Sequence, residues 1–398
     1  MVNTGEFRFD KNFFSWFKVV GFNIFSDEAK TFKGKVLKYF YFVFVILNLI
    51  VVTISQLFFI TKNWNQTNEV YKILPTITNN VLLVFKMIML FKHRKIVVEV
   101  SKWVDAKLIN IDQDNFKLAS HFKKLHRFRI GYTCFLLIGI FLYITFTFLT
   151  FLFYGTERFA FPLSLPFSHT DWRPFWCVQL WFLWNFFNCV VMTYSVNLLV
   201  FSIIMTVGNS FNVLATEIEG FGKKTSIDDI KKFVIRHEDI LSICDKLETI
   251  YSSTFLATFI QSSVLLTLVI FQLIYTTDDL SYMIFLPILT VACTEVYANF
   301  YLGQNLSDSS MLVSEGAYNC EWYCFENLKL RHDVFLIMKR SEKPIKLTAL
   351  AFTELSNKNF AKVKKSRKKH LRNILSNHLF TDYFISLFLL HIDETFLQ

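Results

Sequence analysis

Two charged side chains occur inside long apolar segments, where an ionisable group usually has a structural or functional role. Glu295 is the one carboxylate well inside the apolar segment 282–304, and Lys86 lies toward the end of the segment 71–91. Because an isolated charge is costly in apolar surroundings, such residues mark ion pathways, structural pairs or water-facing positions. Glu295 lies in the C-terminal half of its segment. This position fits a structural pair or a water-facing side chain as well as an ion pathway. We expect Lys86 to snorkel, with its ammonium group reaching water.

The other residues that could do chemistry lack the spacing of a catalytic or metal site. The sequence contains neither a glycine-rich phosphate loop nor a Gly-x-Ser-x-Gly nucleophile elbow. Cys320 and Cys324 are four residues apart, but no second pair of ligands accompanies them. We therefore predict that the chain is not an enzyme and that it has no cofactor and no metal site.

The composition indicates a membrane protein made of helices. Mean hydropathy is +0.37, hydrophobic residues make up 53% of the 398, and charged residues only 19%. A soluble domain of this size needs more charge to cover its surface. The chain contains 48 Phe but only 6 Pro and 11 Gly, so long helices are expected in place of many strands and turns. The predicted fold class is all-α, a polytopic membrane protein.

Six segments are long enough to cross the bilayer as helices. About 20 apolar residues span a hydrocarbon core of about 30 Å. The second segment contains Pro75, which we place in the first turn of its helix, where a missing N–H does no harm. The predicted spans are 36–60, 71–91, 130–154, 175–207, 253–275 and 282–304.

Basic residues alternate between the two sides of these spans. There are ten between residues 92 and 129, six between 208 and 252, and five between 305 and 343. The loops on the other side of the membrane, 61–70, 155–174 and 276–281, carry only Lys62, Arg158 and Arg173. The positive-inside rule therefore places the N-terminus in the cytoplasm, with a topology opposite to that of a G-protein-coupled receptor. The net charge of +10 is explained in the same way, so no nucleic-acid partner is expected.

Two sequons give a further expectation about topology. Asn65, followed by Gln66 and Thr67, lies in the first predicted outer loop, where glycosylation is possible. Asn305, followed by Leu306 and Ser307, is predicted to face the cytosol and to remain unmodified.

The predicted cytosolic segments also show helical periodicity. Apolar side chains before span 5 and after span 6 recur at helical spacing, so we expect helices that extend beyond the bilayer and pack together. Isolated amphipathic helices on the membrane surface are the alternative. The two sets are Ile230, His237, Leu241, Cys244, Leu247 and Tyr251, and then Met311, Tyr318, Trp322, Phe325 and Leu328.

A series of residues after span 6 resembles the C-terminal signature of insect odorant receptors. The resemblance covers the chain to about residue 362 in topology and loop lengths, while the motif itself is specific to residues 300–360. In order, the motif comprises Tyr301-Leu302-Gly303-Gln304-Asn305-Leu306, Ser309-Ser310, Ala317-Tyr318, Trp322-Tyr323, Arg331, Lys343-Pro344, Leu347-Thr348-Ala349, Phe352, Leu355-Ser356 and Phe360.

This resemblance implies a ligand-gated, non-selective cation channel. In that family an odorant-specific subunit and a shared co-receptor form a heterotetramer around one pore, in the plasma membrane of sensory dendrites. The cytosolic helix extensions form an anchor between subunits, and a seventh helix lines the pore. The chain is shorter than the co-receptor and lacks its long second cytosolic loop, so it resembles the odorant-specific tuning subunit. The implied ligand is a small, volatile, largely apolar molecule, and membrane lipid is the other expected contact.

The resemblance places the odorant pocket in the outer halves of spans 2, 3, 4 and 6. A pocket of this kind needs apolar and aromatic walls and a few polar groups. Aromatic residues near span ends also serve as interfacial anchors, and this alternative remains open for each of them. The candidate ligand-binding residues are Tyr71, Leu74, Thr78, Phe146, Leu149, Phe153, Leu180, Trp181, Trp184, Tyr282, Phe285 and Leu289.

The C-terminal tail departs from the family pattern. We divide the chain into a cytoplasmic segment (1–35), six transmembrane helices with the pocket (36–304), a cytosolic anchor helix and the start of the seventh helix (305–361), and a basic tail (362–398). Seven basic residues fall within 362–372, where the pore helix is expected, and each is costly at mid-membrane. We interpret the tail as translated intron that replaces the final exon. A divergent natural C-terminus is the alternative, and sequencing the messenger RNA distinguishes the two.

Two other classes of protein share parts of this pattern. A gustatory-type receptor channel has the same topology, but its usual signature falls in the last span, where this chain departs. A multipass transporter predicts inverted repeats and helices broken by glycine or proline near the membrane midplane. No repeat is visible in the sequence, and span 4 contains neither glycine nor proline.

Overall fold

The computed structural model describes residues 32–65, 67–109, short helical stretches between 127 and 152, and residues 172–275, 279–350 and 353–355. The predictions for 1–31 and for the basic tail lie outside these residues. In chain order the elements are α2 (Phe32–Lys62), α3 (Thr67–Lys92), α4 (Arg94–Ile109), α6 (Trp172–Glu219), α7 (Ile227–Tyr275), α8 (Asp279–Asn319), η2 (Trp322–Cys324), α9 (Leu328–Ser341), β1 (Thr348–Ala349) and β2 (Thr353–Glu354).

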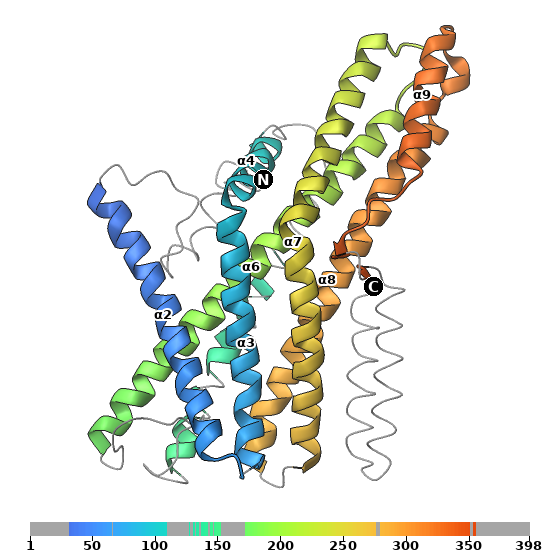
Figure 1. The fold of residues 1–398 in the computed structure, drawn as a ribbon. Helices are drawn as coiled ribbons and strands as arrows, with labels where there is room; N and C mark the ends of the chain where they lie inside the picture. Colours follow the sequence, from blue (N-terminus) through green and yellow to red (C-terminus); the bar gives the residue numbers. More distant parts are fainter. Residues whose placement is uncertain are drawn as a thin grey trace.

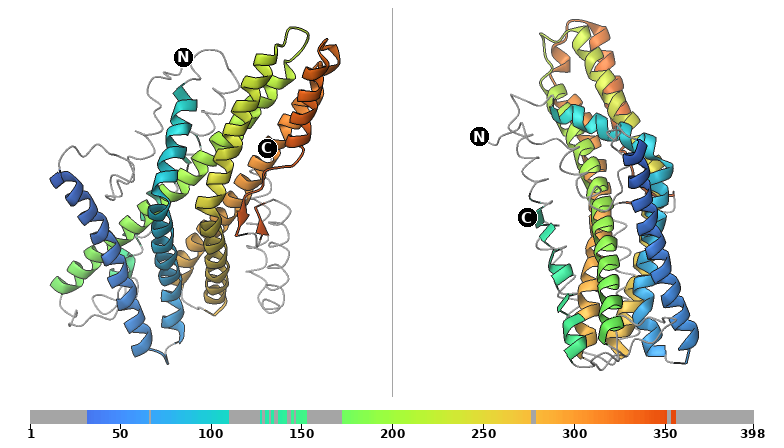
Figure 2. Two further views of the ribbon diagram at one scale, coloured as in Figure 1. Left: turned by 45° about the horizontal axis from the view of Figure 1, so that its top comes forward. Right: turned by 90° about the vertical axis from the view of Figure 1, so that its left-hand side faces the viewer.

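The helices form one elongated bundle (Figure 1). Helices α6, α7 and α8 run its whole length, while α2 and α3 reach along one part of it (Figures 1 and 2). The turn that joins α2 to α3 lies at one end of the bundle, and α9 packs against α8 at the other. The positive-inside rule predicts that the α9 end faces the cytosol.

The composition of the helix surfaces confirms an all-α membrane protein. Within the described residues, four helical segments are long and apolar enough to cross a membrane: Phe42–Lys62, Ile73–Lys92, Trp172–Glu219 and Ile227–Val269. Helix α2 leaves large apolar side chains such as Phe40, Leu47 and Phe58 exposed along its length. A continuous apolar surface of this kind suits contact with lipid tails, because water would penalise it.

Helices α6 and α7 are far longer than a bilayer requires. With 48 and 49 residues they extend about 72 Å and about 74 Å at 1.5 Å per residue.

Helix α7 begins with a capping box, in which the Asp229 carboxylate accepts from the Ser226 N–H at 3.0 Å and the Ser226 hydroxyl accepts from the Asp229 N–H at 3.2 Å. The bond from the Ser226 N–H lowers the pKa of the Asp229 carboxyl group, and so does the Ser226 hydroxyl, which donates to the same carboxylate at 2.8 Å. The prediction of packed helical extensions is confirmed for this region, since Ile230, Leu241 and Leu247 are all buried.

The prediction for the face of the helix after span 6 was wrong for four of its five residues. Met311, Tyr318, Trp322 and Leu328 are exposed and Phe325 is buried as predicted, whereas Val313 and Ala317 lie in the core instead. Near its C-terminal end the buried face of α8 includes the small residues Gly316 and Ala317, which allow close packing on α6: a Cβ built on Gly316 would lie 2.5 Å from the Ala215 carbonyl oxygen. Small residues give a weak hydrophobic signal, which explains why the aromatic residues were assigned to the core instead.

Two boundaries near α3 also differ from the prediction. Helix α3 begins at Thr67, so Pro75 lies inside the helix and not in its first turn. The segment after span 2 was treated as a loop, but α4 occupies Arg94–Ile109. Its Val97, Val100 and Val104 are fully buried at helical spacing, a signal that the many basic residues around them obscured.

The short hairpin of β1 and β2 is held against both α7 and α8. The Glu248 carboxylate accepts from the Thr348 N–H at 3.0 Å and also from its hydroxyl group. The Leu350 N–H donates to the Ser252 hydroxyl at 3.0 Å. On the α8 side, Gly303 leaves room for Leu355, which a side chain at this position would overlap. This hairpin therefore fixes the path of the chain just before the segment that the family pattern assigns to the last helix.

Replacing Gly303 by Ala should displace the hairpin. Its Cβ would collide with the Leu355 backbone and Cβ, so we expect a loss of about 1–3 kcal/mol of stability. Thermal unfolding of the purified receptor and hydrogen exchange over residues 347–355 measure the effect. Gly139→Ala is the matched control, because nothing lies within 4 Å of a Cβ there. Equal behaviour of the two variants would contradict the close approach.

His237 should make the cytosolic extensions sensitive to mild acid. Burial, then the nearby charge of Arg340, lower its pKa below the ordinary 6.5, against a smaller opposing effect of Glu238. Its ring packs against Phe211 and Phe233. His237 in the unfolded chain binds a proton at higher pH than His237 in the folded chain does. The free energy of unfolding is therefore unaffected by this group above pH 6.5 and decreases as the pH falls below that value.

The measurement is the unfolding midpoint between pH 7.5 and 5.5 for the wild type and for His237→Leu. The variant should lose part of the acid sensitivity, whereas His332→Leu, at an exposed position, should retain it. An unchanged pH profile in His237→Leu would show that another group is responsible.

Candidate functional site

The predicted pocket residues on α3 share one face of the helix near its outer end. Tyr71, Leu74 and Thr78 are spaced by three and four residues, and all three are half-buried. The Thr78 hydroxyl donates to the Pro75 carbonyl at 2.9 Å, so its oxygen remains available as an acceptor. This face offers an aromatic ring, an aliphatic side chain and hydroxyl groups, which suit a mostly apolar ligand with one polar atom.

The predicted residues on α6 do not all face the same way. Trp181 donates from its indole N–H to Asn48 on α2 at 3.1 Å. The Trp184 ring lies 5.7 Å from that of Phe44, also on α2, and packs against the main core. Leu180 lies on the exposed side of the helix, with 61% of its surface accessible. The structure thus holds the two tryptophans against α2, a contact with span 1 that the sequence had not indicated.

The remaining candidates are only partly within the described residues. Leu149 is half-buried in the helical stretch that ends at residue 152. Phe146 and Phe153 lie outside the described residues, and so do the side chains of Tyr282, Phe285 and Leu289. The full set of twelve ligand-binding residues therefore stays a prediction.

A layer of polar side chains joins α2, α3 and α6 near the Thr78 level. Asn79 donates from its amide to the Cys189 sulfur at 3.4 Å. Asn80 donates to the Thr53 hydroxyl at 3.4 Å and accepts from the Cys189 thiol at 3.6 Å. Polar groups that face one another across helices satisfy each other away from water. Cys189 is the common partner of Asn79 and Asn80, although it lies on another helix more than 100 residues away.

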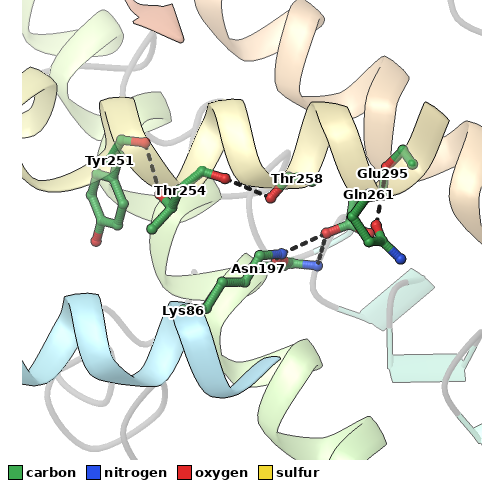
Figure 3. A network of polar contacts seen from close by, with 8 residues as sticks. Lys86, Asn197, Tyr251, Thr254, Thr258, Gln261 and Glu295 are labelled. Atoms are coloured by element: carbon green, nitrogen blue, oxygen red, sulfur yellow. Dashed lines mark hydrogen bonds and ion pairs between the residues drawn. The ribbon is translucent and has the colours of Figure 1, made fainter. Parts of the chain in front are cut away.

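The two charged residues inside the spans meet each other deeper in the bundle. The Lys86 ammonium lies 2.8 Å from the Glu295 Oε1 atom, and the two side chains are only 5% and 17% exposed. Asn197 on α6 completes the group: its Oδ1 accepts from Lys86 at 3.3 Å, and its Nδ2 donates to Glu295 at 3.1 Å. Figure 3 shows these side chains converging from α3, α6 and α8, beside a row of polar residues on α7.

This arrangement corrects the prediction for Lys86 and selects one of the three roles that were open for Glu295. Lys86 does not snorkel to water, because a carboxylate within the bundle satisfies its charge at a buried position. Of the three roles considered for Glu295, the structure shows the structural pair. We refer below to Lys86, Asn197 and Glu295 as the charged triad.

The described residues hold no group of three or more His, Cys, Asp or Glu side chains placed to bind a metal ion. The features that stand out chemically are an aromatic and hydroxyl-bearing outer region and the charged triad below it. Such an arrangement suits recognition of an apolar molecule and control of helix positions.

Comparison with known proteins agrees with the sequence motif. A family model described as "7tm Odorant receptor" matches residues 66–366. Putative odorant receptor 92a of Drosophila melanogaster is 24% identical over 377 residues, a match that covers 88% of this chain and 90% of that protein. Odorant receptor 13a of the same organism is 25% identical over 197 residues, so the chain matches about half of that relative's length, 47%.

Solved structures show the same fold. The insect olfactory receptor OR5 from Machilis hrabei superposes with a TM-score of 0.74 at 11% identity, covering 91% of this chain and 97% of that one. The same receptor in complex with eugenol gives a TM-score of 0.73 at 10% identity, with 91% and 98% covered. These identities are too low to support more than the fold. The family match extends over well more than half of the chain, and this membrane protein is therefore a receptor of the 7tm odorant receptor family and not an enzyme.

Proposed function

We propose that this chain is the odorant-specific subunit of a ligand-gated, non-selective cation channel that it forms with the odorant receptor co-receptor. It binds a small, volatile, mostly apolar molecule between the outer parts of α3, span 3, α6 and α8. The observation that carries this proposal is the family match over residues 66–366. It favours the odorant branch over a gustatory-type channel or a multipass transporter.

The outer region supports ligand binding of this kind. The half-buried Tyr71, Leu74 and Thr78 supply mixed apolar and hydroxyl groups, and Trp184 supplies a large aromatic surface. The Machilis hrabei receptor of the same fold has been solved with eugenol, a small molecule. Contacts with an apolar ligand depend mainly on shape and buried area, so selectivity should follow the form of this region.

The cytosolic end supports assembly with a partner subunit. Outside the predicted membrane spans, α8, η2 and α9 leave a set of large apolar side chains exposed. Exposed apolar patches beyond the bilayer mark protein interfaces, because water disfavours them. This set supports a role as the anchor between subunits, and it comprises Met311, Leu312, Tyr318, Trp322, Tyr323, Leu328, Phe335 and Leu336.

The proposed location is the plasma membrane, in a multi-pass arrangement with a cytoplasmic N-terminus, and the family implies the dendrite of a sensory neuron. The distribution of basic residues supports this orientation.

Odorant-evoked currents test the proposed function. The chain should produce cation currents with a panel of small volatiles only when it is expressed together with the co-receptor. In Trp184→Ala the half-maximal concentration should rise about tenfold or more, because removing an aromatic wall costs at least about 1.4 kcal/mol of ligand contact. Trp172→Ala is the matched control, since Trp172 is 64% exposed at the helix end.

Responses are normalised to the amount of receptor at the cell surface. Currents that do not require the co-receptor, or an equal loss in both tryptophan variants, would contradict the proposal.

Glycosylation tests the orientation. Asn65 is exposed in the turn between α2 and α3, at the end of the bundle assigned to the outside. The expressed receptor should lose mass on glycosidase treatment, and Asn65→Gln should abolish that shift. Asn305→Gln should leave it unchanged. A glycan on Asn305, on the opposite side of the predicted membrane, would reverse the topology.

A further inference from the structure

The three helices joined by the charged triad also carry most of the predicted pocket. Lys86 lies eight residues after Thr78 on α3, and Glu295 six residues after Leu289 on α8. Asn197 lies thirteen residues after Trp184 on α6. At 1.5 Å per residue these separations are about 12, 9 and 20 Å along the helix axes. The charged triad is therefore a common connection one to a few turns below the region where a ligand is proposed to bind.

The hydrogen-bond pattern of the charged triad restricts how the helices can be placed. Asn197 uses both ends of its amide, accepting from Lys86 and donating to Glu295. The Glu295 Oε1 atom receives both Lys86 and Asn197. Each residue contacts the other two, so a rotation or shift of any one helix breaks at least two of the three contacts.

Stability alone is a poor explanation for such a group. Replacing a whole buried ion pair by apolar residues is often neutral or stabilising, whereas removing one partner leaves an uncompensated buried charge. What the charged triad supplies is a defined arrangement, because its three contacts form together only when α3, α6 and α8 approach one another at this level.

We propose that the charged triad is a set of positioning residues that fixes α3, α6 and α8 relative to one another and thereby sets the ligand concentration at which the receptor responds. This inference rests on the proposed function for its ligand response. The helix positioning itself does not depend on it.

A double-mutant cycle tests the positioning. Lys86→Met and Glu295→Gln each leave one buried charge without its partner, whereas the double variant leaves none. Hydrogen exchange of the purified receptor should increase around residues 86, 197 and 295 in each single variant and return toward the wild-type level in the double variant. If a single variant fails to reach the cell surface, the double variant should still do so. Single variants without effect, or a double variant as impaired as the sum of the two, would overturn the proposal.

The same variants test the link to the ligand. In cells that also express the co-receptor, each single variant should shift the half-maximal odorant concentration about tenfold, and the double variant should lie within about threefold of wild type. A defect in folding alone lowers the amount of surface receptor and leaves this concentration unchanged. The proposed link would be overturned if the double variant restored hydrogen exchange but the single variants had an unaltered half-maximal odorant concentration.

The exposed pair of Lys246 and Glu99 is the matched control. It joins α7 to α4 at 2.7 Å, but its side chains are 31% and 60% exposed. Lys246→Met, Glu99→Gln and their combination should leave both measurements near wild type, because exposed ion pairs contribute little. If wild type gives no odorant current at all, the proposed function fails, and the hydrogen-exchange cycle still decides whether the charged triad positions the helices.

Discussion

The close packing of α8 on α6 is the constraint on which the rest of the structure depends. These two helices share the most extensive contact in the described residues. Gly316 allows the backbones to approach beyond the predicted membrane, while Asn197 and Glu295 join the same two helices within it. One continuous interface thus connects the outer region to the cytosolic end. Helix α9 packs on α8 at the end of this interface, and the hairpin of β1 and β2 is held between α8 and α7.

Inside the bundle, polar groups serve to define contacts between helices. Water is excluded there, so each amide, hydroxyl or charge needs a partner within the protein. Asn79 and Asn80 form hydrogen bonds with Cys189, and Lys86 forms them with Glu295 and Asn197. Apolar side chains tolerate many packings, but these polar contacts are satisfied in few of them. The polar contacts therefore specify which helices lie side by side, and the apolar surface provides most of the attraction.

The proposed receptor function uses both kinds of contact. An apolar ligand in the outer region gains affinity through area and shape, and it can shift a conformational equilibrium only through different contacts in the two states. In the proposed function, the helices that contact the ligand are joined to one another at the charged triad, so a small displacement near Trp184 or Thr78 is transmitted to it. The long continuous α6, α7 and α8 then extend past the membrane to the proposed subunit interface.

The sequence by itself determined the class of fold and the family, because hydropathy, basic flanks and the motif after span 6 are local features. Of the six predicted spans, the first, second, fourth and fifth overlap candidate membrane helices of the described residues, and the other two stay predictions. It also identified the buried face at Ile230 and Leu241, where large side chains mark the helix period. It misassigned the face of α8, since the small residues around Gly316 carry little hydrophobic signal. Only the tertiary structure decided that Lys86 pairs with Glu295, 209 positions away. Partnership across helices depends on how they pack, and no local pattern encodes it.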